Sequence, residues 1–188
     1  MIPAFDPFTT QMDIATGVLD PERKTTCQRL ADMQGWYTED VDAGDADQLV
    51  YRVLHMPVPE ENSEIQCSTT VLQPGRVGRE YFMTRGHFHE VRDRSEVYIG
   101  LRGEGRLVLA SEDGRHVVEP LVPGAVCYIP GGWAHRSVNV GDEPLVFFAA
   151  FVGDAGHDYG TIEKQGFPVL VVAGDDGPEV VPNPRYRT

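Results

Sequence analysis

The sequence predicts an all-β sandwich or barrel, because short apolar segments alternate with turn residues from about residue 48 onward. These segments are rich in Val, Ile, Phe and Tyr, and glycines and prolines such as Pro123-Gly124 separate them. Neither a βαβ alternation nor a phosphate-cradling glycine loop occurs, which argues against a nucleotide-binding fold. The nine expected strands are Leu49–Met56, Ile65–Leu72, Glu96–Leu101, Arg106–Ala110, Val117–Leu121, Ala125–Ile129, Arg136–Val140, Leu145–Val152 and Val169–Ala173.

Ahead of the strands, the sequence predicts an irregular N-terminal arm over residues 1–20 and then one helix. Asp20 can cap this helix, Pro21 suits its first turn, and Gly35 can end it after Gln34. We expect the helix to pack on the sheet and to carry no chemistry.

Length and composition indicate a soluble globular protein of one domain spanning residues 1–188, with a barrel core at about 48–152. The net charge of −13 with no basic patch argues against nucleic acid as a partner. No apolar stretch reaches eighteen residues, so no membrane span is expected. The N-terminus lacks the pattern of a signal peptide, and we therefore expect a cytoplasmic protein. The three cysteines form no CxxC pair, so a thiolate zinc site is not expected.

Two of the six histidines lie close together, at His87 and His89. Residues two apart in a strand point to the same face, so both imidazoles are expected to project toward one metal ion. Glu96 opens the next apolar segment, and the charged stretch 90–94 between them reads as a turn. A hairpin here would bring Glu96 beside the histidine pair.

A fourth ligand is expected at His135, which follows the turn at Gly131-Gly132. Three histidines and one carboxylate leave one or two coordination positions open for water or substrate, unlike a closed structural zinc site. These ligands suit iron(II), manganese, nickel or zinc, and the sequence does not choose among them. His55 and His116 lie apart from this group and are expected to be structural.

The stretch from Gly124 to Asn139 resembles the second cupin motif, G-x5-P-x-G-x2-H-x3-N, at every fixed position. The stretch from His87 to Gly103 resembles the first cupin motif, but with six residues between His89 and Glu96 where most cupins have three or four. Together with the phrases GHFH, EVY, WAHRSVN and DAGHDYG, this spacing resembles the cupin-type phosphoglucose isomerases from about residue 20 to the end. The resemblance implies a cupin double-stranded β-helix, or jelly-roll barrel, with one metal per chain, iron(II) being favoured.

The resemblance also implies interconversion of glucose 6-phosphate and fructose 6-phosphate, a reaction of glycolysis and gluconeogenesis. Hydrogen must move between C1 and C2, and Glu96 is the candidate proton shuttle. A carboxylate engaged with a metal is a poor base, so either Glu96 releases the metal or the reaction is a hydride shift. By resemblance, His157 is the candidate for ring opening, whereas the alternative is a loop histidine hydrogen-bonded to Asp158.

Several residues are expected to bind the substrate. Thr84, Arg85 and Gly86 could offer a hydroxyl, a guanidinium and a backbone N–H to the phosphate group, and Arg85 can bind two oxygens at once. By resemblance, Thr70 is a further phosphate ligand, and Tyr98 and Tyr159 could line the sugar pocket.

Two positions depart from the pattern of this family. Phe151 and Gly132 stand where archaeal members carry tyrosines near the substrate. Three alternatives therefore stay open: a cupin dioxygenase, an isomerase of a different sugar phosphate, and a non-catalytic sugar-phosphate-binding cupin. By resemblance we expect a homodimer.

Overall fold

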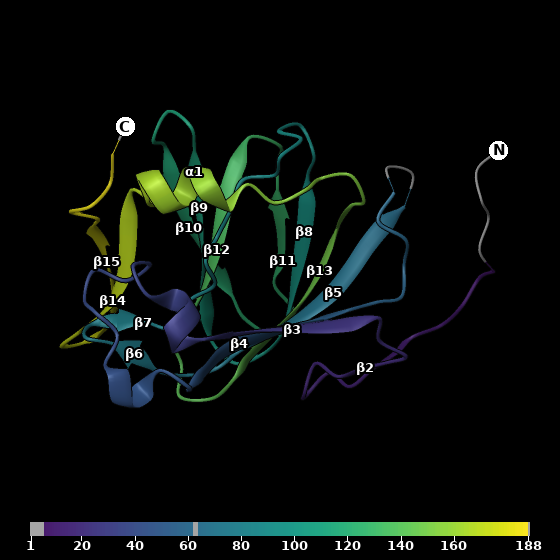
Figure 1. The fold of residues 1–188 in the computed structure, drawn as a ribbon, viewed down its shortest axis with the longest axis horizontal. Helices are drawn as coiled ribbons and strands as arrows, with labels where there is room; N and C mark the ends of the chain where they lie inside the picture. Colours follow the sequence, from purple (N-terminus) through teal and green to yellow (C-terminus); the bar gives the residue numbers. More distant parts are fainter. Residues whose placement is uncertain (1–5, 62–63, 188) are drawn as a thin grey trace.

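The computed structural model describes residues 6–61 and 64–187, and two facing sheets dominate it (Figure 1). The larger sheet has the strand order β11-β8-β13-β5-β4-β3, and the smaller one has the order β10-β9-β12. All pairings within both sheets are antiparallel. The strands of the larger sheet are β3 (Lys24–Arg29), β4 (Leu49–His55), β5 (Ile65–Leu72), β8 (Glu96–Arg102), β11 (Val126–Ile129) and β13 (Leu145–Val152). Those of the smaller sheet are β9 (Gly105–Ser111), β10 (His116–Leu121) and β12 (Trp133–Asn139).

A four-stranded sheet of order β15-β14-β7-β6 lies at one side of the molecule (Figure 1). Its strands are β6 (Arg76–Val77), β7 (Glu80–Tyr81), β14 (Val169–Gly174) and β15 (Gly177–Pro182). The helix α1 (Tyr159–Gln165) connects β13 to this sheet. Isolated bridges join the segment after β7 to β12, at Met83↔Val138 and His87↔His135. The histidine pair is therefore fixed to the smaller sheet.

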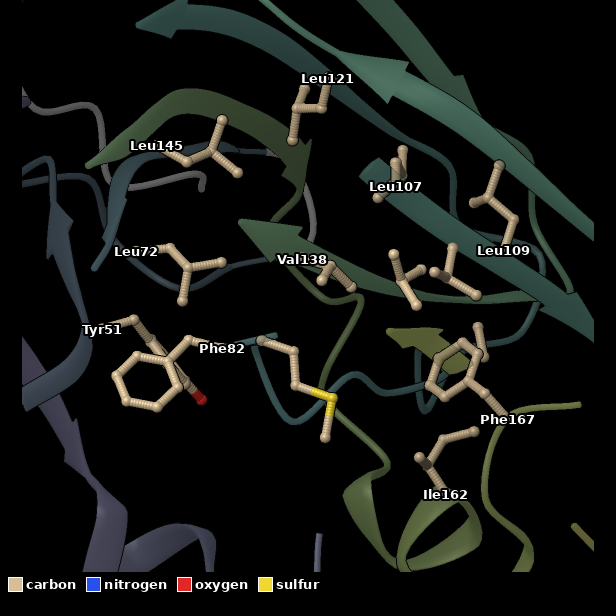
Figure 2. Packing of buried hydrophobic residues seen from close by; sticks show 14 of the residues in the cluster. Tyr51, Leu72, Phe82, Leu107, Leu109, Leu121, Val138, Leu145, Ile162 and Phe167 are labelled. Carbon is tan, nitrogen blue, oxygen red and sulfur yellow. The ribbon is translucent and has the colours of Figure 1, made fainter. Parts of the chain in front are cut away.

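One apolar core fills the space between the sheets. Leu72 of the larger sheet and Leu107 and Val138 of the smaller one belong to the same buried cluster (Figure 2). The cluster extends to Ile162 of α1 and to Phe167, which follows this helix. Because both sheets contribute to one core, the barrel packs as a unit. No helix within the described residues is long and apolar enough to span a membrane.

All nine predicted strands are confirmed, and two of them, β5 and β13, have the predicted bounds. These two pair along their whole length, from Leu145↔Leu72 to Val152↔Ile65. Central strands are buried on both faces, which explains why they read as continuous apolar runs.

The predicted helix after residue 20 is wrong. This segment forms β3 and then a short 3-10 helix at Leu30–Met33. β3 pairs with β4, so it provides hydrogen-bond partners for a strand that would otherwise be a sheet edge. Here tertiary pairing outweighs the local signals for a helix. The single α-helix of the described chain is instead α1, whose N-cap Asp158 accepts a 3.0 Å hydrogen bond from Thr161 N.

Part of the expected N-terminal arm is ordered as a hairpin, because β1 (Gln11–Met12) pairs with β2 (Leu19–Asp20). The turn of this hairpin packs on the larger sheet: Thr69 Oγ1 donates to the Gly17 carbonyl. Residues 1–5 of the predicted arm lie outside the described residues.

Candidate metal centre

The four predicted ligands come together in the interior of the barrel. One ligand atom from each of His87, His89, Glu96 and His135 lies within 4.8 Å of every other. Two histidines come from the extended segment after β7, Glu96 is the first residue of β8, and His135 lies on β12. Phe88 points the opposite way and is 1% exposed in the core, as the strand alternation predicted.

The chemistry of this donor set fits a divalent cation. The Nε2 atom of His87 is buried and has no hydrogen-bond partner among the described residues. Glu96 Oε2 lies 3.1 Å from His89 Nε2 and 3.0 Å from His135 Nε2. Burial by itself raises the pKa of the Glu96 carboxyl group, but the neighbouring His135 and His89 imidazoles outweigh this effect and lower it to about 2. A buried carboxylate beside three imidazole rings is a set of donors that suits a divalent cation.

Backbone carbonyls orient two of the imidazoles. His89 Nδ1 lies 2.9 Å from the Arg94 carbonyl oxygen, and His135 Nδ1 lies 3.4 Å from the Trp133 carbonyl oxygen. A carbonyl oxygen only accepts hydrogen bonds, so each contact favours the tautomer with the proton on Nδ1, in which Nε2 can bind a metal.

Two arginines fix the loops on either side of the centre. Arg92 donates to Asp158 Oδ2 at 2.6 Å and to the His89 carbonyl. Arg94 forms two hydrogen bonds with Asp154, at 2.7 and 2.8 Å. The sequence showed these arginines only as part of a charged turn; the pairing with a loop 60 residues away needs the fold.

A cavity of about 240 Å³ opens onto three of the predicted ligands, His87, Glu96 and His135. His157 and Tyr159 line it, with their rings stacked at a centroid distance of 5.9 Å. The His157 ring centroid also lies 4.5 Å from that of His87. Burial lowers the pKa of His157, so its imidazole is neutral at neutral pH.

The Asp158 carboxylate does not hold His157, because it bonds Thr161 and Arg92 instead. The alternative reading of His157 as a histidine paired with Asp158 is therefore wrong.

Five of the six predicted substrate residues line this cavity, namely Thr70, Thr84, Gly86, Tyr98 and Tyr159. Thr84 Oγ1 accepts a 3.0 Å hydrogen bond from Ser137 N, which leaves its own hydroxyl proton free to donate. Gly86 has a positive φ of 74°, a conformation that glycine adopts readily. Burial raises the pKa of Tyr98 well above its usual value and keeps the phenol protonated.

Arg85 points away from the cavity, contrary to the prediction that its guanidinium would face the phosphate. Its Nη2 donates to the Asp32 carbonyl at 2.6 Å, and its guanidinium lies 5.6 Å from the centre of the Trp36 ring. Successive residues of an extended segment face opposite sides, so Thr84 and Arg85 cannot both face the cavity.

Several lining residues were not predicted as site residues, and three of them carry a charged, phenolic or imidazole group. Lys24, Tyr51 and His55 lie on β3 and β4 and line the cavity. Lys24 is the only lysine or arginine among the described lining residues. Lys24 was missed as a site residue because its segment was predicted to be a helix, whereas it forms β3. His55 was expected to be structural because it alternates with core positions in its strand.

The two departures from the family pattern differ in position. Phe151 lines the cavity, with its ring centroid 5.7 Å from that of His157. Gly132 does not line it, and its φ is 79°. Of these two, only Phe151 borders the space available to a substrate.

A jelly-roll barrel with three inward-facing histidines and a glutamate defines a cupin with a candidate metal centre. The chain belongs to the glucose-6-phosphate isomerase (GPI) family, whose model matches residues 27–183. It is 41% identical to glucose-6-phosphate isomerase of Pyrococcus horikoshii over 186 residues, which cover 97% of this chain and 98% of that protein. It is 35% identical to glucose-6-phosphate isomerase of Sinorhizobium medicae, covering 100% and 91% of the two chains.

A solved structure of oxalate oxidase shares the fold, with a TM-score of 0.51 at 15% identity. The match covers 62% of this chain and 58% of that chain. At this identity the likeness concerns the fold alone, which agrees with the predicted cupin barrel.

Proposed function

We propose that the protein is a metal-dependent aldose-ketose isomerase that interconverts glucose 6-phosphate and fructose 6-phosphate. The observation that carries this proposal is that one cavity combines three of the metal ligands with hydroxyl donors and His157. Family membership supports the same reaction, because relatives that match nearly the whole chain are glucose-6-phosphate isomerases.

The four residues His87, His89, Glu96 and His135 would hold one divalent ion, and we propose iron(II), with manganese, nickel and zinc as substitutes. Bound there, the ion supplies Lewis acidity for the negative charge that develops on the substrate oxygens.

The phosphate group of the substrate needs donors in this acidic protein. Thr70, Thr84 and the Gly86 backbone N–H offer three, since the Gly86 N–H has no protein acceptor within the described residues. Lys24 supplies a local positive charge at the cavity, although Glu60 lies 3.3 Å from its Nζ. Tyr98 and Tyr159 would contact the sugar. Arg85 is not part of this proposal, because its guanidinium is engaged at the Asp32 carbonyl.

Glu96 is the proposed proton shuttle between C1 and C2. Its carboxylate is charged, as a base must be, but a pKa lowered to about 2 makes it a weak base. The shuttle therefore requires that substrate binding raises this pKa. The competing route is a hydride shift, in which the substrate hydrogen never exchanges with water. Deuterium from the solvent in the product would support the shuttle, whereas complete retention of the substrate hydrogen would eliminate it.

His157 is the proposed acid or base for ring opening. Its lowered pKa leaves a neutral imidazole at neutral pH, which can accept a proton from a sugar hydroxyl and return it to the ring oxygen. The stacked Tyr159 ring and the nearby Phe151 ring hold the imidazole against the cavity.

A coupled assay tests the proposed function. Fructose 6-phosphate is added to purified protein and formation of glucose 6-phosphate is followed, before and after chelation and with iron(II), manganese or zinc restored. We expect turnover that disappears on chelation and returns with metal. Absence of turnover from folded, metal-loaded protein would exclude the reaction.

That negative result would direct attention to the alternatives. Oxygen consumption with an oxidisable substrate would indicate a dioxygenase, and binding of a sugar phosphate without conversion would indicate a non-catalytic protein. Turnover of another sugar phosphate would indicate a changed substrate preference. Phe151 would then be the first residue to replace, because it borders the cavity.

We further propose a cytoplasmic homodimer that acts in glycolysis and gluconeogenesis. The reaction itself belongs to these pathways, and small cupins commonly pair through an edge strand or an N-terminal arm. Light scattering of the purified protein would measure the oligomeric state directly.

A further inference from the structure

A second cavity, of about 510 Å³, lies on the other side of the wall that holds the metal centre. It shares no lining residue with the first cavity. Trp36, Arg136, Lys164, Asn183, Arg185 and Arg187 are among the residues that line it. Four parts of the chain therefore meet here: the loop after the 3-10 helix, β12, α1 and the C-terminal stretch beyond α1.

The position of Arg136 explains how the two cavities are separated. His135 and Arg136 are neighbours on β12, so their side chains point to opposite faces of the strand. His135 belongs to the metal centre, whereas the Arg136 guanidinium packs on Phe167, 4.6 Å from the ring centre. Arg136 is 5% exposed, and its Nε and Nη2 both donate to the Arg85 carbonyl, at 3.1 and 2.6 Å.

The cations of this cavity have no carboxylate partner within the described residues. They share this property with Arg29, Arg52, Arg76 and Arg85, and they differ from those four in lining one common cavity. Of the 16 lysines and arginines, eight form ion pairs with aspartate or glutamate: Arg23, Lys24, Arg79, Arg92, Arg94, Arg102, Arg106 and Arg115. None of the cations that line the second cavity does so within the described residues: Arg136, Lys164, Arg185 and Arg187.

Acidic residues are not scarce in this protein, which has 29 of them against 16 basic ones. Glu163 is the only acidic residue among the described lining residues, and it forms no ion pair within the part of the chain that the structure describes. Four unpaired cations around one cavity, in a chain with a net charge of −13, are the arrangement expected where an external anion completes the charge balance.

We propose that this second cavity binds a small oxyanion, a phosphate or carboxylate group, through Arg136, Arg185, Arg187 and Lys164. Planar guanidinium groups bind two oxygens of such an anion at once, and the half-buried Trp36 ring provides an apolar wall. Arg136 is buried, so a bound anion would offset the cost of holding its charge away from water. The inference goes beyond the proposed isomerase function, since the metal cavity is separate.

Backbone carbonyls account for part of the local charge balance but not for all of it. Arg185 donates to the Tyr37 carbonyl at 2.6 Å and to the Thr38 carbonyl. Lys164 lies in the last turn of α1, where the helix dipole favours a cation. Carbonyl dipoles carry only partial charges, so they leave the net positive charge of the four side chains in place.

Fluorescence of Trp36 provides a direct test. The chain has two tryptophans, so Trp133→Phe leaves Trp36 as the only one. The metal-loaded variant is titrated with inorganic phosphate, and separately with malonate, at constant ionic strength. No sugar phosphate is added, because its phosphate group would compete for the second cavity; the charge-removal variants assign the response to one cavity. We expect saturable quenching or enhancement with at least one anion, and a rise in the melting temperature with the same concentration dependence.

Charge removal then localises the binding. In the same background, Lys164→Ala/Arg187→Ala should weaken anion binding about tenfold or more, because two charge-assisted contacts are lost. The matched control Arg76→Ala/Arg115→Ala removes the same charge outside this cavity and should change the affinity less than about twofold. Absence of a fluorescence response to both anions, or equal weakening in the two double variants, would overturn the proposal. Neither result depends on catalytic turnover.

Discussion

The two faces of β12 have opposite electrostatic requirements. On one face, His135 joins two more imidazoles and the Glu96 carboxylate, and this set lacks a positive charge. On the other face, Arg136 contacts aromatic rings and a carbonyl oxygen, and it forms no ion pair within the described residues, although the buried Glu80 lies close enough to favour its charge. One strand thus separates a candidate cation site from a candidate anion site by the alternation of neighbouring side chains.

The largest expected effect is the loss of metal binding and turnover when His135 is replaced. His135→Ala should abolish metal binding and reduce turnover by more than about a hundredfold, since loss of supporting groups alone costs ten- to a hundredfold around metal sites. Metal analysis of the purified variant, together with the coupled assay, measures both quantities. His116→Ala, on the exposed edge strand β10, is the control and should retain metal and activity. A fully metal-loaded His135→Ala protein would contradict the assigned ligand set.

The second prediction concerns His157, whose replacement should affect turnover without affecting metal binding. His157→Gln should lower turnover by about a hundredfold or more, the usual range for loss of a general acid–base group. Metal content should stay at the wild-type value, because His157 is not among the four ligands. Steady-state kinetics and metal analysis on one preparation make the comparison. Unchanged kinetics would remove His157 from the mechanism.

The third prediction concerns Gly86, which packs between the metal cavity and Arg136. A Cβ atom on Gly86 would lie 2.7 Å from Phe167 Cε2 and 3.0 Å from Arg136 Cβ. Gly86→Ala should therefore lower the free energy of unfolding by about 1–2 kcal/mol through its positive φ, and further through these contacts.

Gly132→Ala is the matched control for Gly86→Ala. Gly132 has a similar φ of 79°, but a Cβ there meets no atom within 4 Å. Chemical denaturation of both variants should show the larger loss at Gly86. Equal losses would mean that packing between the cavities contributes nothing.

The smallest expected effect concerns His55, at the edge of the metal cavity. Burial, with the nearby Lys24 and Arg23 charges, lowers the pKa of His55 to about 4. The unfolded chain, with a histidine pKa near 6.5, binds more protons in this range, so stability should fall as the pH drops from about 6.5 to 4. His55→Gln should remove about 1 kcal/mol or less of this pH dependence, because His55 is only partly buried. Denaturation at pH 7 and pH 5 measures the difference, and an unchanged pH dependence would contradict it.

The metal centre and the second cavity also differ in how far the sequence predicts them. The metal ligands were predictable because they fall in two short motifs whose spacing matches strand alternation, and the strands were predictable because their apolar runs are bounded by glycine and proline. Lys24 was missed because its segment carries helix-capping signals, yet it pairs with β4 at the edge of the sheet.

Other features depend on contacts that are distant in the chain. The direction of Arg85 depends on Trp36 and Asp32, 49 and 53 residues away. The second cavity depends on the C-terminal segment, where Arg185 reaches the Tyr37 carbonyl 148 residues earlier. No local pattern encodes such encounters, so they became visible only in the folded chain.

A metal titration of turnover tests the central claim most directly. Metal-free protein is prepared by chelation, iron(II) is added in measured amounts without oxygen, and the rate of fructose 6-phosphate isomerisation is plotted against bound metal. Turnover should rise in proportion to bound metal and level off at one ion per chain. Full turnover in metal-free protein, or a rate that is independent of bound metal, would contradict the account.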